Sequence, residues 1–137
     1  MARIRPGDVH PRADRITTPP PPPGYVAFSY RYFSVTDKFN TRACDTRWFD
    51  GLFDRLRSLS SLRPQEILSN RSDSLRAHPI DFSRTSEPAG FAHLNEQLRG
   101  HRPYQFQLSR STGRVHGFFV GLVFHVVWMD PHHRLYP

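Results

Sequence analysis

The longest apolar region of the chain, Val115–Met129, is interrupted by two histidines and two glycines. Because a membrane-spanning helix needs about 20 mostly apolar residues, this region does not predict one. It predicts two strands instead, Arg114–Val120 and Leu122–Met129, joined by a tight turn that includes Gly121. The second strand carries β-branched and aromatic residues on both faces, which is typical of a central strand covered on both sides.

Two more strands are predicted from alternating side chains. The segment 104–109 alternates apolar and polar residues, and Arg110–Gly113 is expected to turn the chain into the next strand. Far upstream, Tyr25–Val35 also alternates. The aromatic side of that first strand comprises Val26, Phe28, Tyr30 and Tyr32.

Helical periodicity is clearest after Asp45 and Thr46, either of which can cap a helix. Its apolar stripe comprises Trp48, Phe49, Leu52, Phe53, Leu56 and Leu59. Pro64 favours the first turn of a second, short helix through Gln65–Ser69. The segment Asn70–Gly100 is weakly patterned, with one or two helical turns expected in Phe91–Leu98; such segments are often functional loops or contain elements that the pattern does not reveal.

This order of elements predicts one α+β domain over residues 24–137, with an N-terminal strand, a helical pair and a C-terminal antiparallel meander of three strands. Residues 1–23 contain Pro6, Pro11 and the run Pro19–Pro23, and are expected to be a disordered leader. The proline run predicts a short polyproline II rod, either a ligand for a proline-binding groove or a spacer.

The chain is basic, with 19 Lys+Arg against 12 Asp+Glu and a formal net charge of +7, and Lys38 is its one lysine. Arginine makes bidentate contacts to phosphate, so this balance favours an anionic partner such as nucleic acid. An acidic protein partner is the alternative. With Cys44 as the single cysteine, no disulfide can form within the chain, and we expect a cytoplasmic protein.

No strong catalytic motif is present, so candidate chemistry comes from clusters of arginine, histidine and tyrosine. The first cluster is C-terminal and contains His132, His133, Arg134 and Tyr136 beside Asp130. Histidine and tyrosine can move protons at a phosphodiester, and arginine can hold the phosphate. The alternative is a solvated polar tail.

A second cluster lies on the strand that begins at Arg114, where His116 and Phe118 share its face. Such a face could hold an RNA phosphate and stack a base; alternatively, Arg114 marks the strand edge and His116 is partly buried and hydrogen-bonded. Arg110, in the preceding turn, is a further candidate nucleic-acid-binding residue.

The third cluster comprises Arg76, His78 and Asp81 in the weakly patterned segment. Asp81 could orient the ring of His78, although ordinary hydrogen bonds within a loop are the alternative. No spacing among the histidines and aspartates is diagnostic of a metal site, so no metal or cofactor is predicted. A metal-dependent hydrolase remains an alternative interpretation.

The element order, together with the segments 113–118 and 130–136, resembles the RelE/YoeB/ParE superfamily of toxin–antitoxin toxins. Several of its members cleave mRNA on the ribosome without a metal, while the ParE branch targets DNA gyrase. The resemblance implies that Arg114 contacts the scissile phosphate, and that His132, His133 and Tyr136 are candidates for assisting proton transfer. The chain departs from the family in its leader and in Asn70–Gly100.

These observations lead to the hypothesis of a toxin that acts as a metal-independent RNA endonuclease. RNA, in some cases ribosome-bound, and an acidic antitoxin-like protein would then be its partners. Arg76, His78, Arg110, His116 and Arg134 would contribute to nucleic-acid binding. The main alternative is a basic interaction protein that binds nucleic acid or a protein without catalysis.

Overall fold

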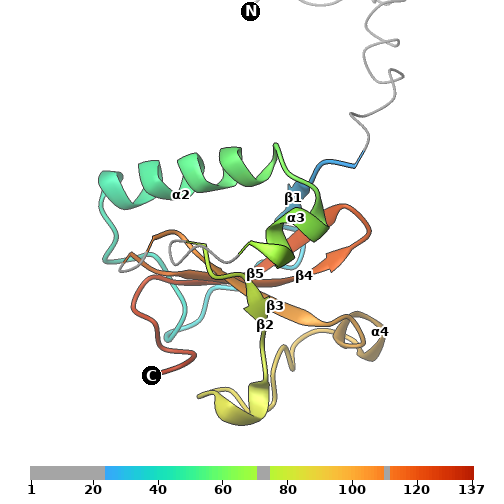
Figure 1. The fold of residues 1–137 in the computed structure, drawn as a ribbon. Helices are drawn as coiled ribbons and strands as arrows, with labels where there is room; N and C mark the ends of the chain where they lie inside the picture. The colour runs from blue at the N-terminus through green and yellow to red at the C-terminus, as the bar shows by residue number, and fades with distance from the viewer. Residues whose placement is uncertain (1–23, 71–74, 110–111) are drawn as a thin grey trace, which may run out of the picture.

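The computed structural model describes residues 24–70, 75–109 and 112–137, so the predicted leader and Arg110 lie outside the described residues. The described part is an α+β fold, in which three α-helices pack with a five-stranded mixed sheet (Figure 1). The strands are β1 (Ala27–Ser29), β2 (His78–Pro79), β3 (Pro103–Gln107), β4 (Arg114–Val120) and β5 (Val123–Asp130). The helices are α2 (Thr46–Leu59), α3 (Pro64–Ser69) and α4 (Glu96–Arg99), with a 3-10 turn, η2, at Phe82–Arg84.

The sheet has the order β1-β5-β4-β3-β2. Strands β3, β4 and β5 form the predicted antiparallel meander, with Gly121 and Leu122 as the turn between the last two. At one edge β1 pairs parallel to β5, and at the other the two-residue β2 pairs antiparallel to β3. The alternating pattern of 104–109 and the two-sided apolar pattern of β5 were therefore reliable indicators of strands.

A β-bulge interrupts the β4–β5 pairing next to Gly117. His116 pairs with Trp128 and Gly117 with Val126, so Val127 of β5 has no partner on β4. The carbonyl of Val127 instead accepts a hydrogen bond from the Ser34 N–H at 2.9 Å. A Cβ atom added to Gly117 would collide with the backbone carbonyl of His125, so the close approach of the two strands requires a glycine.

The change Gly117→Ala is therefore expected to lower the free energy of unfolding by at least about 2 kcal/mol, because strand backbone must move to accommodate the methyl group. Gly51→Ala is the matched control, since nothing lies within 4 Å of a Cβ atom there and the site is inside α2. Alanine in a helix should stabilise by roughly 0.5–1 kcal/mol relative to glycine. Urea unfolding measures both; equal effects would contradict the strand-contact explanation.

The predicted strand Tyr25–Val35 was too long, since only Ala27–Ser29 forms β1. The chain turns directly afterwards, where the Phe33 N–H donates to the Tyr30 carbonyl at 3.0 Å. As a result, Phe28 packs on one face of the sheet and Tyr32 packs on the other. The alternating side chains therefore divide between two hydrophobic cores, and Tyr30 is 45% exposed, a distribution that alternation in the sequence cannot predict.

Both predicted helices are confirmed, and the side chain of Asp45 accepts from the Trp48 N–H at 2.9 Å as the cap of α2. Leu52, Leu56 and Leu59 of α2 are buried. However, Phe53 is 63% exposed, so the predicted apolar stripe was one residue too wide. No helix within the described residues has the length and apolar character needed to cross a membrane.

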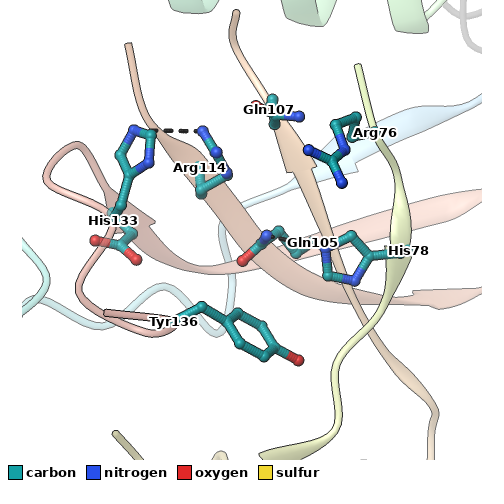
Figure 2. Close-up of a pocket in the computed structure, with 8 residues that line it drawn as sticks. Arg76, His78, Gln105, Gln107, Arg114, His133 and Tyr136 are labelled. Atoms are coloured by element: carbon teal, nitrogen blue, oxygen red, sulfur yellow. Dashed lines mark hydrogen bonds between the residues drawn. The ribbon is translucent and has the colours of Figure 1, made fainter. Parts of the chain in front are cut away.

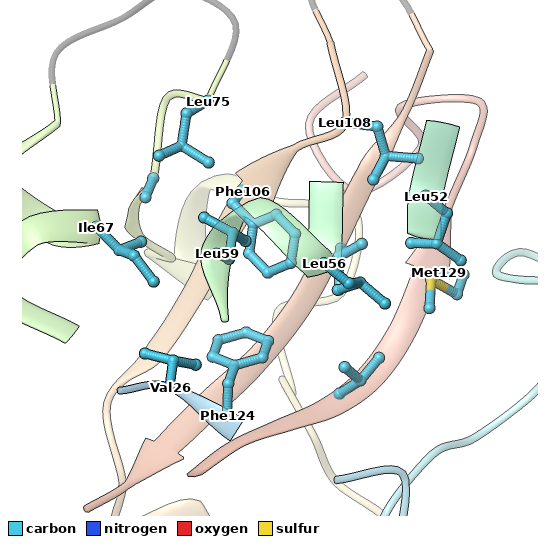
Figure 3. Packing of buried hydrophobic residues seen from close by; sticks show 13 residues of the cluster. Val26, Leu52, Leu56, Leu59, Ile67, Leu75, Phe106, Leu108, Phe124 and Met129 are labelled. Atoms are coloured by element: carbon cyan, nitrogen blue, oxygen red, sulfur yellow. The ribbon is translucent and has the colours of Figure 1, made fainter. Parts of the chain in front are cut away.

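Hydrophobic cores lie on both faces of the sheet. The first is under α2 and α3, where leucines of α2 meet Phe106, Phe124 and Met129 of the strands (Figure 3). The second, on the opposite face, contains Phe39, Ile80, Phe91, Leu94, Phe118, Val127, Trp128 and Leu135. The weakly patterned segment Asn70–Gly100 supplies three members of this second core, and within it the structure places β2, η2 and α4. That segment therefore contains short elements that periodicity could not reveal.

Candidate functional site

A pocket of about 180 Å³ opens at one end of the sheet, on the face opposite α2 (Figure 2). Six segments supply its walls: the approach to β2, the strands β2, β3 and β4, the end of β5, and the C-terminal tail. The lining residues are Arg76, His78, Gln105, Gln107, Arg114, Asp130, His133 and Tyr136. Every one of them carries a polar group, so the pocket is suited to a polar or charged ligand.

The register of the sheet explains why these side chains meet. Gln105 is aligned with His78 of β2, and Gln107 is aligned with Arg114 of β4. Arg114 is in turn aligned with Asp130 at the end of β5. Gln105 and Gln107 are two residues apart on β3, so their side chains point to the same face.

Asp130 fixes the C-terminal tail beside the pocket. Its Oδ1 accepts from the Arg134 N–H at 2.7 Å, and its Oδ2 accepts from the Leu135 N–H at 3.0 Å. The same Oδ2 accepts from Nε2 of His116 at 3.1 Å. His116 has none of its surface exposed and Asp130 has 1%, so this hydrogen-bonded pair is fully internal. Leu135 is likewise buried, and it anchors the tail in the second core.

Burial lowers the pKa of His116 despite the opposing effect of its hydrogen bond to Asp130. Burial alone would raise the pKa of Asp130, but hydrogen bonds from His116 and from the N–H groups of Arg134 and Leu135 outweigh it and hold that pKa below its usual value. The pair is therefore a neutral imidazole, protonated on Nε2, beside an ionised carboxylate.

These shifts predict how the stability depends on pH. Below its ordinary pKa of about 6.5, the imidazole of His116 takes up a proton in the unfolded chain but not in the folded one. The charges that face His116 are Asp130, Arg114 and His78. The free energy of unfolding should fall below pH 6.5, by up to about 1.4 kcal/mol per pH unit for one proton. Burial also lowers the pKa of His125, which acts in the same direction.

A second decline is expected below about pH 4, where Asp130 becomes protonated in the unfolded chain before the folded one. Urea unfolding between pH 7.5 and 3 measures both stages. His125→Phe is a suitable control, because the ring stacks beside Phe118 and phenylalanine preserves that contact. A stability that stays constant between pH 7 and 5 in this variant would contradict the role given to His116.

His133 and Arg114 meet across the pocket. Nη1 of Arg114 lies 3.3 Å from Nε2 of His133, so the guanidinium donates and the ring accepts (Figure 2). His133 has a φ of +56° and Arg76 a φ of +39°, and these are the two described residues other than glycine with positive φ. Both line the pocket. Backbone conformations of this kind are costly and concentrate at functional sites.

On the opposite wall, His78 is held through both ring nitrogens. Nδ1 donates to the Pro79 carbonyl at 2.8 Å, and Nε2 accepts from Nε2 of Gln105 at 3.1 Å. The ring of Tyr136 meets that of His78 edge to face at 5.9 Å. The Tyr136 oxygen accepts from the Asp81 N–H at 3.0 Å, so its own O–H can donate to another group.

The pocket carries a net positive charge. Burial lowers the pKa of Arg114, the charge of Asp130 opposes that shift, and the nearby charge of Arg76 adds to it. Arginine nevertheless stays protonated at neutral pH. Asp130, the one carboxylate in the lining, already accepts three hydrogen bonds from His116 and the tail. An anion with several acceptor oxygens would complement the two guanidinium groups.

The structure brings together five of the predicted site residues: Arg76, His78, Arg114, His133 and Tyr136. His132 and Arg134 are exposed and do not line the pocket. His116 lies wholly inside the protein, so in this arrangement it has no surface with which to contact a nucleic acid. Of the two interpretations of His78 and Asp81, ordinary hydrogen bonds within a loop are the one observed, because Asp81 caps η2 through Ser83.

Gln105 and Gln107 were missing from the predicted site. Their alternation with apolar residues was visible, but alternation does not reveal that both are buried or that they line a pocket. Within the described residues, no group of three His, Cys, Asp or Glu side chains is arranged to hold a metal ion.

Comparison with known proteins adds no assignment: no family model, no curated protein and no solved structure matches the chain. The fold and the pocket therefore define a class only in structural terms, an α+β protein with a cationic pocket at the end of a mixed sheet.

Proposed function

We propose that the chain is a toxin-type RNA endonuclease that works without a metal ion. The observation that carries the proposal is the convergence of Arg76, Arg114, His78 and His133 on one pocket. Two cations that can hold a phosphodiester and two imidazoles that can move protons are sufficient for RNA cleavage by the 2′-hydroxyl. The helical pair and the C-terminal meander agree with the RelE-like resemblance, whereas the fifth strand, β2, goes beyond the predicted pattern.

In this mechanism Arg114 and Arg76 bind the non-bridging oxygens of the scissile phosphate. One imidazole removes the proton of the 2′-hydroxyl, and that oxygen forms a bond to phosphorus. The bond from phosphorus to the 5′-oxygen breaks, and the other imidazole donates a proton to this leaving group. The products are a 2′,3′-cyclic phosphate and a 5′-hydroxyl. His78 and His133 come from opposite walls, which suits the two roles, and the Tyr136 O–H can donate to a phosphate oxygen (Figure 2).

A second candidate function is binding of RNA or another polyanion without cleavage. It is favoured by one observation: Nε2 of His78 already accepts a hydrogen bond from Gln105, so the ring must exchange that partner before it can act on a substrate. Binding without cleavage would depend on Arg76 and Arg114 and would weaken steeply with salt.

Expression in a bacterial host, wild type beside Arg114→Gln, tests the proposal through growth and mRNA integrity. We expect growth arrest with fragmented mRNA, and we expect the variant to lose both effects because it loses a guanidinium at the phosphate. Growth arrest with intact mRNA would refute the proposed endonuclease activity and indicate another target, as in the ParE branch. An absence of arrest would favour the binding protein. A small acidic protein encoded by a neighbouring reading frame would support the toxin proposal.

A further inference from the structure

An apolar groove of about 330 Å³ lies between α2 and the segment that follows β1. Its lining residues are Tyr30, Phe33, Thr41, Phe49, Leu52, Phe53 and Met129. Tyr30, Phe33 and Phe53 are exposed. Leu52 and Met129 belong to the core under α2, so the groove lies on the face of the sheet opposite the cationic pocket. Exposed apolar surface gathered in this way marks a site of contact with another chain.

Four aromatic rings give the groove its shape. Tyr30 meets Phe33 edge to face, with 6.1 Å between the ring centroids and 80° between the planes. Phe49 and Phe53, one helical turn apart on α2, belong to the other wall. The hydroxyl groups of Tyr30 and Thr41 can donate to carbonyl oxygens of a bound segment. The groove therefore combines aromatic faces with hydrogen-bond donors and has no charged group in its lining.

An aromatic groove of this kind suits a proline-rich segment in the polyproline II conformation. Such a segment makes no hydrogen bonds within itself, so its carbonyl oxygens remain acceptors for groups on a partner. Its backbone is already restricted, so little conformational entropy is lost when it binds. The chain contains one such segment, the run Pro19–Pro23, to which the proposed function gives no role.

The charges beside the groove complement those beside the proline run. Asp50 lies between Phe49 and Phe53 in the sequence of α2, is exposed, and forms no ion pair with another of the described residues. In the leader, Arg12 and Arg15 precede the run. A guanidinium of a docked leader can pair with the Asp50 carboxylate, and such an exposed contact orients a partner more than it adds affinity.

The run is poorly placed to fill the groove of its own chain. It ends directly before Gly24, and the Val26 N–H donates to the Leu62 carbonyl at 2.9 Å, so the chain enters β1 beside the C-terminal end of α2. Phe49 and Phe53 lie about 10–15 Å before that end, at a rise of about 1.5 Å per residue. Five prolines span about 15 Å in polyproline II. Even if the chain reversed at Gly24, only the far end of the run would reach the groove, whereas the run of a second copy has no such restriction.

We propose that the aromatic groove binds the proline run Pro19–Pro23 of a second copy of the chain. The pyrrolidine rings pack against Tyr30, Phe33 and Phe53, and the hydroxyl groups of the groove donate to proline carbonyls. Each copy carries one groove and one run, so two copies can exchange their leaders and close a symmetric dimer. The groove and the cationic pocket lie on opposite faces of the sheet, so this inference is independent of the proposed endonuclease activity.

The test uses two variants of the full chain, each of which removes one half of the contact. In the run variant, every proline of Pro19–Pro23 is replaced by serine; in the groove variant, Phe53→Ser removes an exposed ring. Sedimentation equilibrium at rising concentration should show that the wild type dimerises. Each variant alone should dimerise at least about tenfold more weakly, as expected when a central aromatic contact is lost. An equimolar mixture should associate more tightly than either variant alone, because it contains an intact groove and an intact run.

Leu122→Ser is the matched control, because this exposed apolar residue lies in the turn after β4 and outside the groove; it should dimerise as the wild type does. A wild type that stays monomeric at every concentration would refute the proposal. A run variant that dimerises as tightly as the wild type would refute it too, and would indicate direct contact between two grooves. If the mixture associated no better than either variant alone, the groove and the run would not meet across copies, and the assignment would be wrong.

Discussion

Replacing Asp130 with asparagine should lower the free energy of unfolding by about 3 kcal/mol, the loss expected when one partner of a buried hydrogen-bonded pair is neutralised. The carboxylate accepts from His116 and from the N–H groups of Arg134 and Leu135. An asparagine has one acceptor oxygen, and its amide group would face a donor, so at least one buried donor loses its partner. Urea unfolding at pH 7 measures the effect.

The same change should release the C-terminal tail. In the wild type, exchange of the Leu135 amide hydrogen is expected to require extensive unfolding, because this N–H donates to a buried carboxylate. In Asp130→Asn it should exchange at least about a hundredfold faster, and the positions of His133 and Tyr136 should become less well defined. The variant therefore tests whether one internal pair organises the tail side of the pocket.

Asp81→Asn is the matched control for this experiment. Asp81 is an exposed carboxylate that caps η2 by accepting from the Ser83 N–H at 3.1 Å. Asparagine caps a helical turn about as well as aspartate does, so we expect a much smaller change in stability. Equal losses in Asp81→Asn and Asp130→Asn would mean that burial of the His116–Asp130 pair does not explain the effect.

The elements that were predicted correctly are those whose signal lies within one segment. The cap at Asp45, the proline at the start of α3 and the alternation in β3 all act through neighbouring residues, so the sequence reveals them. The strand β2 has two residues and exists because it pairs with β3, some 26 positions further along the chain. Its stability comes from that pairing, and no local pattern could predict it.

The candidate site could likewise be predicted only as far as local sequence patterns allow. Residue types suited to phosphate chemistry were found in three separate clusters, but their convergence depends on the pairing of β2 with β3 and on the anchoring of the tail by Asp130. Sequence reasoning could not decide between His132 and His133. The backbone at His133 is left-handed, and this turns its ring to Arg114 while His132 remains exposed. Which of two adjacent histidines enters a pocket is decided by tertiary contacts.

The pair His132 and His133 also provides the sharpest test of catalysis. The change His133→Asn should reduce the rate of RNA cleavage by about 100-fold or more, the usual contribution of a positioned acid or base. Asparagine tolerates a left-handed backbone, so the change should preserve the fold of the tail. His132→Asn, one residue away and outside the pocket, should retain nearly the full rate. Cleavage is measured on free RNA and on mRNA bound to translating ribosomes.

A substrate with a 2′-methoxy group at the cleaved position should not be cut, because the attacking hydroxyl is missing. His78→Asn should reduce the rate of RNA cleavage as much as His133→Asn does. The double variant should be only a little slower than either single variant, because the two imidazoles act in one step. The rate of RNA cleavage by the wild type should fall at both low and high pH. His78→Asn and His133→Asn should each remove one of these two declines. If His132→Asn and His133→Asn were impaired equally, or if the methoxy substrate were cleaved, the two-imidazole mechanism would be wrong, although the pocket could still bind RNA.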